Sequence, residues 1–156
     1  MMTSTEMMMN NNLINGSDAL ALHRQAAALF NREQRSGQLR RLLAWLTGHS
    51  NRLHPLCHRK ANGHYLGTRT VAINQIHGSE SRSEDFDFFF HPLQGRSMSR
   101  WVSVALARQN GVALPPVELI KVGDEYFVRD GHHRVSVARA LGWAFIDARV
   151  TKLELK

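Results

Sequence analysis

The sequence predicts a mixed α/β fold of the α+β type, in which a mixed sheet carries flanking helices and follows an N-terminal helical hairpin. Apolar residues alternate along residues 68–76, 117–121 and 146–150, which is typical of half-buried strands. Gly123-Asp124 separates 117–121 from a second strand-like run at 126–129, so these two segments are expected to form a β-hairpin. Helical spacing of apolar residues occupies the segments between the other strands.

The chain of 156 residues divides into three expected parts. Residues 1–16 are expected to be a disordered leader, and residues 17–64 a basic helical extension. Residues 65–156 are expected to form the mixed-sheet domain, which is long enough to bury its own core.

The extension is predicted to be a helical hairpin because helical spacing occurs on both sides of a glycine. Ser17-Asp18 can cap a first helix, and Gly37 is expected to break it. A second helix would bury the leucines at 39, 42, 43 and 46, which recur at i, i+3, i+4 and i+7. This arrangement would leave Arg40 and Arg41 facing solvent.

Positive charge is concentrated in this extension. The formal net charge is +7, and residues 24–60 hold eight Arg or Lys against Glu33 alone. Such an arm on an otherwise balanced chain indicates a polyanionic partner, with sequence-nonspecific DNA favoured over a membrane. A solvated hairpin without a partner is the alternative. The residues expected to contact DNA phosphates are Arg32, Arg35, Arg40, Arg41, Arg52, Arg59 and Lys60.

Cysteine content and the N-terminus bear on localisation. Cys57 is the only cysteine, which excludes an intramolecular disulfide and favours a cytoplasmic protein. Residues 1–12 lack a basic segment followed by a long apolar run, so neither a signal peptide nor a membrane span is expected.

The most informative stretch runs from Tyr126 to Gly142 and reads as strand, tight turn and helix. Asp130 can cap the helix, and Gly131 permits a backbone conformation closed to other residues. The backbone N–H groups of the helix start, its dipole and the Arg134 guanidinium would then converge on one point. This point suits a phosphate group. The alternative is that Asp130-Gly131 only caps a packing helix and that the adjacent histidines are solvated.

An acidic cluster precedes this stretch and is mixed with aromatic residues. Glu84, Asp85 and Asp87 are candidate ligands for a Mg²⁺ ion that accompanies a nucleotide, because hard cations prefer carboxylate oxygens. The phenylalanines at 86, 88, 89 and 90 cannot all face one core within a strand. Some of them could therefore line a cleft or another element, although burial in the core is the favoured interpretation.

The order of these pieces resembles the ParB/sulfiredoxin superfamily, specifically the ParB N-terminal, ParB-like nuclease type. The resemblance rests on the strand ending at 71–76, LPPVEL at 114–119, YFVRDGHHR at 126–134, RALG at 139–142 and FIDARV at 145–150. It covers residues 68–151, with Gly131 and Arg134 matching the family's Gly-x-x-Arg. The resemblance implies ATP or CTP and Mg²⁺ as cofactors, with nucleotide phosphates held by Asp130, Gly131, His132, His133 and Arg134.

Two departures from the family limit this resemblance. The chain ends at Lys156 without the family's second motif of adjacent Glu and Asn or a helix-turn-helix. His132 also stands where sulfiredoxins have a catalytic cysteine, so sulfinic acid repair is not expected.

The leading hypothesis is a nucleoside-triphosphate-binding protein that acts on DNA and hydrolyses the nucleotide or cuts DNA with a metal. His132 and His133 are candidate general acids or bases, since the imidazole pKa lies near neutrality. A small-molecule phosphotransferase with Glu118 or one of the acids at 84–87 as base is the second hypothesis. A non-enzymatic, nucleotide-gated regulator associated with DNA is the third. The oligomeric state is left open, with a homodimer as one outcome.

Overall fold

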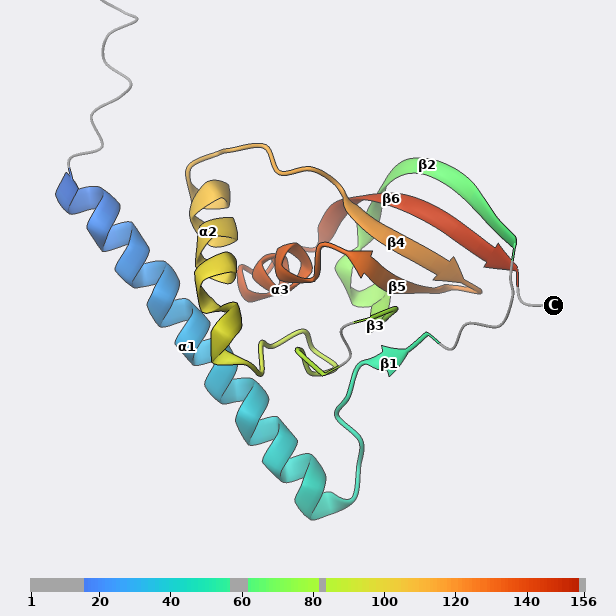
Figure 1. Cartoon of the computed structure of the whole chain (residues 1–156), viewed down its shortest axis with the longest axis horizontal. Helices are drawn as coiled ribbons and strands as arrows, with labels where there is room; N and C mark the ends of the chain where they lie inside the picture. The colour runs from blue at the N-terminus through green and yellow to red at the C-terminus, as the bar shows by residue number, and fades with distance from the viewer. Residues whose placement is uncertain (1–15, 57–61, 82–83, 155–156) are drawn as a thin grey trace, which may run out of the picture.

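The computed structural model describes residues 16–56, 62–81 and 84–154 as a mixed sheet with helices on one side (Figure 1). The sheet has six strands in the order β1-β3-β5-β4-β6-β2. The helices are α1 (Gly16–Thr47), α2 (Met98–Gln109) and α3 (His132–Ala140). The strands are β1 (His54–Pro55), β2 (Asn62–Ala72), β3 (Ile76–Ser79), β4 (Val117–Val122), β5 (Glu125–Asp130) and β6 (Phe145–Glu154).

Strand pairing confirms the mixed sheet expected from the sequence. β4 and β5 form the predicted antiparallel hairpin, and β6 returns parallel to β4 and antiparallel to β2. β3 lies parallel to β5 on the other side of the hairpin, which brings Ser79 level with Val128. The ends of β3 and β5 therefore meet at one edge of the sheet, directly before α3 begins.

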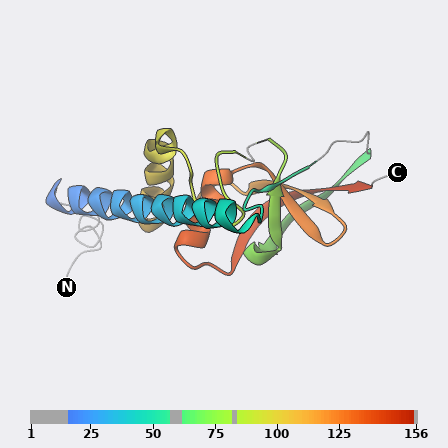
Figure 2. The same ribbon diagram turned by 90° about the horizontal axis from the view of Figure 1, so that it is seen from below.

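The helices follow one another outward from the sheet, and each contacts the next. α3 lies against β4, α2 packs on α3, and α1 packs on α2. Trp101 of α2 donates an indole N–H to Ser136 Oγ of α3 at 2.9 Å and meets Phe30 of α1 edge-on at 5.6 Å between ring centroids. A second core made of α1, α2 and α3 thus stands beside the core under the sheet. Figure 2 shows α1 running along the outside of this assembly.

The predicted helical hairpin is wrong, because α1 is one continuous helix of 32 residues. Gly37 lies buried in its middle, where a Cβ would come within 2.9 Å of His91 Cβ. The glycine permits close approach of the segment that contains His91, and it does not end the helix. The cost of glycine in a helix interior is modest, about 1 kcal/mol, and the close packing of His91 and Leu93 on Gly37 offsets it.

The side of α1 that faces the domain also differs from the expectation. The leucines at 39, 42, 43 and 46 are between 53% and 64% exposed, although their spacing suggested a buried stripe. The buried positions of α1 are Ala26, Phe30 and Gly37. At about 100° per residue these three positions point away from the leucine stripe, so the helix packs through a different side from the one its leucines suggested.

The expected boundary between residues 64 and 65 falls inside β2. Preceding residues also belong to the domain, because β1 pairs with β3 and the Leu53 side chain is fully buried in the sheet core. The extension and the domain are therefore joined into one structure. None of the helices in the described ranges is long and apolar enough to cross a bilayer.

Candidate functional site

The predicted strand-turn-helix is confirmed at the edge of the sheet where β3 and β5 end. β5 ends at Asp130, Gly131 has φ +95°, and α3 begins at His132 with a bond from the Val135 N–H to the Gly131 carbonyl at 3.0 Å. The expected cap by Asp130 is wrong. Gly131 occupies the cap position and no side chain bonds there, because the Asp130 carboxylate instead accepts from Arg134 Nη2 at 2.6 Å.

Two constraints require glycine at position 131. Its positive φ is unfavourable for residues with a Cβ. A Cβ would also lie 2.6 Å from Val117 Cγ1, at the start of the neighbouring strand β4. The start of α3 is therefore pressed directly onto β4.

Arg134 connects α3 to the segment that leads into β4. Its Nη1 donates to the carbonyl oxygens of Pro115 and Pro116, the latter at 3.0 Å, and its Nη2 pairs with Asp130. These three acceptors occupy much of the guanidinium that the sequence assigned to a phosphate. Arg134 thus holds the walls of the site together, and its charge still contributes to the local field.

The two histidines are buried beside Phe86. His132 Nε2 and Ser79 Oγ share a hydrogen bond of 2.7 Å, and the His132 ring stacks on Phe86 with centroids 6.0 Å apart. His133 meets the same Phe86 ring edge-on at 5.4 Å. The structure therefore contradicts the alternative of solvated histidines. A catalytic role for either histidine stays a prediction.

A pocket of about 270 Å³ lies over the first turn of α3. Its lining combines residues from α2, the segment before β4, and the loop itself: Arg100, Val104, Leu114, Pro115, Asp130, Gly131, His132, His133 and Arg134. Arg100 is an addition that the sequence did not suggest. A single arginine on an amphipathic helix carries no local signal, and only the packing of α2 on α3 brings it to this pocket.

Two other arginines near the site form hydrogen bonds with protein groups. Arg129 forms a two-pronged contact with Glu80, with Nε to Oε2 at 2.8 Å, and this contact raises the Arg129 pKa above its ordinary value. Arg139 donates from Nη2 to the carbonyls of Ile73 and Ile76, and burial lowers its pKa. Both side chains fix the segments around β3 that support the pocket.

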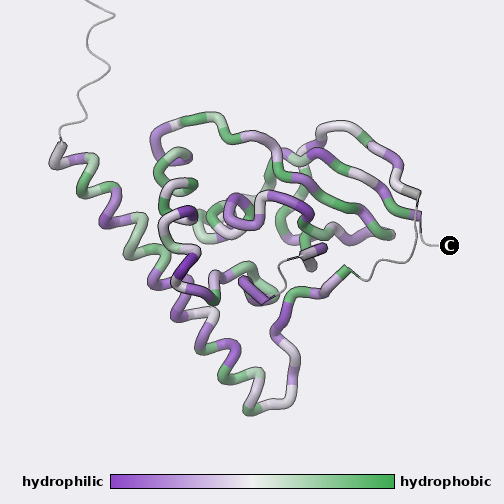
Figure 3. The backbone as a smooth tube through the Cα atoms, viewed as in Figure 1, coloured by the Kyte–Doolittle hydropathy of each residue, from purple (hydrophilic) through white to green (hydrophobic). Residues whose placement is uncertain are grey.

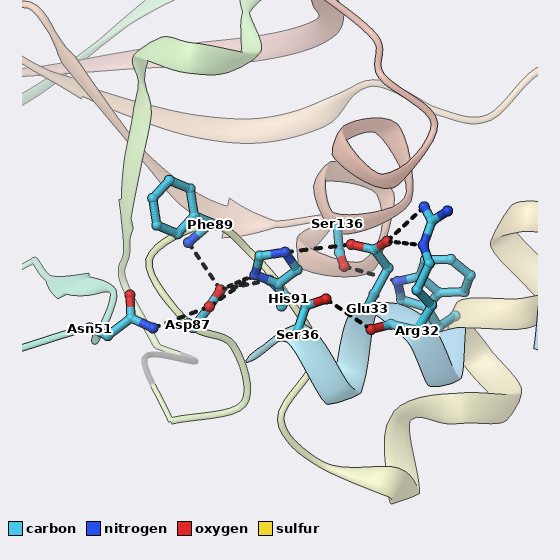
Figure 4. A network of polar contacts seen from close by, with 9 residues as sticks. Arg32, Glu33, Ser36, Asn51, Asp87, Phe89, His91 and Ser136 are labelled. Carbon is cyan, nitrogen blue, oxygen red and sulfur yellow. Dashed lines mark hydrogen bonds and ion pairs between the residues drawn. The ribbon is translucent and has the colours of Figure 1, made fainter. Parts of the chain in front are cut away.

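The acidic cluster does not form the expected magnesium site. Asp87 is buried, accepts the backbone N–H of Phe89 and of His91 at 3.0 and 2.8 Å, and contacts His91 Nδ1 (Figure 4). Asp85 pairs with Arg96 at 2.9 Å, and Glu84 is exposed and lines a different pocket beside Arg52. Within the described residues, no group of three or more His, Cys, Asp or Glu is placed to bind a metal.

Asp87 instead organises a turn that attaches to α1. His91 lies between Asp87 and Glu33 of α1, with Nε2 at 3.5 Å from Glu33 Oε2 (Figure 4). Phe86 and Phe90 of the same turn are buried, and Phe89 is exposed. Phe86 and Phe90 therefore belong to the core, as the favoured interpretation expected. Phe86 also packs against the rings of His132 and His133.

Glu118 lies away from the pocket. It is not among the lining residues, and its carboxylate faces Arg149 Nη1 at 3.8 Å on the neighbouring strand β6. Its expected role as a base stays a prediction without a geometric link to the site.

The residues expected to bind DNA lie in several different surroundings. Arg32 pairs with Glu33, and the Arg40 guanidinium sits 4.4 Å from the Phe89 ring centroid. Arg41 and Arg52 line a separate pocket of about 360 Å³ near the C-terminus of α1, and Arg35 is exposed. Arg59 and Lys60 lie outside the described residues.

Comparisons with known proteins were made at the level of sequence and of structure. No family model matches the chain, and no curated protein sequence matches it. The crystal structure of sulfiredoxin from Arabidopsis thaliana is similar over 55% of this chain and 84% of that chain, at 16% identity and a TM-score of 0.42. We draw no conclusion from a likeness at this TM-score. The mixed sheet is established by the strand pairing described above.

Proposed function

We propose that the protein binds a nucleoside triphosphate, ATP or CTP, with its phosphates over the first turn of α3. The observation that supports this proposal is the pocket in which Gly131 begins the helix and two arginines, Arg100 and Arg134, form part of the lining. Helix N-termini favour anions through their backbone N–H groups and their partial positive charge. The guanidinium groups add charge that suits phosphate oxygens.

The charges around the pocket favour an anion despite the presence of a carboxylate. Asp130 is paired with Arg134 at 2.6 Å, which offsets its negative charge. Arg100 adds a second positive charge from α2. The site thus has a net positive lining, as an anion requires.

A small apolar cavity adjoins this pocket. A small cavity of about 50 Å³ shares Val104, Leu114, Pro115 and Arg134 with the first pocket and is otherwise lined mainly by apolar residues, including Trp143. Ligand sites commonly combine such apolar walls with a few polar groups that fix orientation. The larger pocket, at about 270 Å³, has room for more than a phosphate group, which supports a nucleotide over inorganic phosphate.

The residues present do not fit a dedicated magnesium site. Mg²⁺ in nucleotide sites needs one or two carboxylates beside the phosphates, and Asp85 and Asp87 are engaged elsewhere. Asp130 is the carboxylate of the pocket lining and is paired with Arg134. We therefore derive nucleotide binding from the protein's own positive groups. NTP hydrolysis, DNA cleavage and phosphotransfer to a small molecule stay proposals that single-turnover assays with and without DNA separate from binding alone.

The test uses Arg100, because its removal leaves the Arg134 contacts in place. Isothermal titration of the full chain with ATP, CTP and inorganic phosphate should show binding of a nucleotide. Arg100→Ala should weaken that binding about ten- to a hundredfold, the range of a charge-assisted contact. Arg24→Ala removes an arginine on exposed α1 and serves as the matched control. Equal affinities of wild type and Arg100→Ala would contradict the proposal, as would binding of phosphate as tight as that of nucleotide.

We further propose that DNA binds along the side of α1 that is turned away from α2, between residues 24 and 35. Arg24, Arg32 and Arg35 are exposed, and at about 100° per residue they lie on the side turned away from α2. Contacts to phosphates release counterions, so affinity falls with salt by about 0.9 in log–log slope for each contact.

Salt titration of duplex DNA binding tests this second proposal. Arg24→Gln combined with Arg32→Gln should make the slope shallower by about 1.8 and leave nucleotide binding unchanged. Arg69→Gln combined with Arg149→Gln removes the same charge from the sheet and should leave the slope as in wild type. If both pairs change the slope equally, binding depends on net charge and not on α1.

A further inference from the structure

The C-terminal third of α1 exposes a continuous apolar stripe. Leu39, Leu42, Leu43 and Leu46 span about 100° of the helix surface, on the side opposite the residues that pack on α2. Trp45, about 60° around the helix from Leu42, is 76% exposed. In Figure 1 the C-terminal end of α1 extends beyond α2, and Figure 3 shows apolar residues along it. Contiguous apolar surface of this kind marks an interaction site.

We propose that a second copy of this chain covers the stripe, with the two α1 helices antiparallel about a two-fold axis. The spacing of the leucines is symmetric about the midpoint between 42 and 43. A two-fold contact must be self-complementary. It places Leu39 against Leu46 of the partner copy, and Leu42 against Leu43 of the partner copy. Four leucines from each copy then fill one seam.

The helix ends favour this direction over a parallel one. The last turn of α1 has no basic residue, so its final carbonyl groups are not offset by a charge of their own helix. In the antiparallel register Arg35, which lies on the side of the stripe, sits just beyond Thr47 of the partner copy. Its guanidinium is then at the negative end of the partner helix, and this contact occurs at both ends of the seam.

The size of the seam determines how tightly the copies associate. Four leucines and one tryptophan per copy bury less than the roughly 1,200 Å² of the smallest stable interfaces. We therefore expect a reversible dimer with a dissociation constant between about 10 µM and 1 mM. The domains do not obstruct it, because each packs on the opposite side of its own α1.

Sedimentation equilibrium of the full chain over this concentration range tests the dimer. The average mass should rise from 17.7 kDa toward twice that value as concentration increases. Leu43→Glu should weaken association at least about tenfold, since it places a charge in the seam of both copies. Leu20→Glu is the matched control, because Leu20 is an exposed leucine of α1 outside the stripe. Circular dichroism melts confirm that each variant is folded.

A charge-swap variant tests the direction of pairing. Leu39→Glu combined with Leu46→Lys places opposite charges together in an antiparallel seam and like charges together in a parallel one, so it should dimerise more strongly than Leu39→Glu alone. A monomer at all concentrations would overturn the proposal. So would weakening by Leu20→Glu equal to that by Leu43→Glu. Binding of monomers to anionic phospholipid vesicles, lost in Leu43→Glu, would assign the stripe to a membrane surface and overturn it as well.

Discussion

Replacing Gly131 by alanine tests the geometry on which the candidate site depends. Two costs arise from the structure. A residue with a Cβ at φ +95° costs about 1–2 kcal/mol. A Cβ at 2.6 Å from Val117 Cγ1 forces the start of α3 away from β4, at a cost of about 1–3 kcal/mol for overpacking. Alanine also reduces the conformational entropy of the unfolded chain, which stabilises the folded protein by about 0.4–1 kcal/mol.

The net loss in the free energy of unfolding should be about 1–5 kcal/mol, a large part of the 5–15 kcal/mol of an ordinary domain. Gly111→Ala separates the two costs, because Gly111 has φ +70° and no atom within 4 Å of an added Cβ. Backbone strain and the unfolded-state effect are shared by both variants. The difference between them is therefore the contact with Val117, expected to be about 1–3 kcal/mol.

Urea unfolding followed by circular dichroism measures both variants. Adding Val117→Ala to Gly131→Ala should give a loss smaller than the sum of the two single losses, since it removes the clashing methyl group. Equal losses in Gly131→Ala and Gly111→Ala would refute the close approach of α3 to β4. The pocket over the first turn would then lack the rigid wall that we assign to it.

Three other substitutions test contacts that the structure shows and the sequence did not suggest. Gly37→Ala should destabilise by up to about 2 kcal/mol in thermal unfolding, because contact with His91 outweighs the gain of about 1 kcal/mol in helix propensity; stabilisation would show that Gly37 is not packed. Asp87→Asn should cost about 1–3 kcal/mol through its charged turn contacts and leave a magnesium titration of nucleotide binding unchanged; the reverse result would restore the metal hypothesis. Ser79→Ala should cost about 1 kcal/mol and weaken nucleotide binding less than Arg100→Ala does; the opposite order would mean that His132 contacts the ligand.

The parts of the site that were predictable depend on local sequence. The turn at Gly131 follows from a β-branched and aromatic run, a glycine and helical spacing within one stretch, so strand, turn and helix were all identified. Arg100 and Ser79 were missed because packing brings them to the loop across 30 and 53 residues of sequence. Residue types and their spacing do not show which residues far apart in the sequence lie close together in the fold.

The errors in α1 have a different physical origin. Periodicity shows that a helix has an apolar stripe, but it does not show what covers that stripe. In α1 the small residues Ala26 and Gly37 allow close packing on the domain, and the leucines are left on the other side.

The acids at 84–87 were misassigned for a similar reason. Carboxylates that bind a metal and carboxylates that hold a turn have the same composition, and only Asp87's partners distinguish them.

The strand order also constrains how the chain folds. The β4–β5 hairpin joins neighbouring residues, whereas β2 and β6 pair Asn62 with Glu154 across almost the whole domain. Closing a long loop costs entropy before any contact repays it, so local pairs form early and distant pairs late. β3 reaches the hairpin from the N-terminal side, and the Ser79–His132 contact can form only after it docks. We therefore expect the pocket to be among the last regions to gain amide protection during refolding.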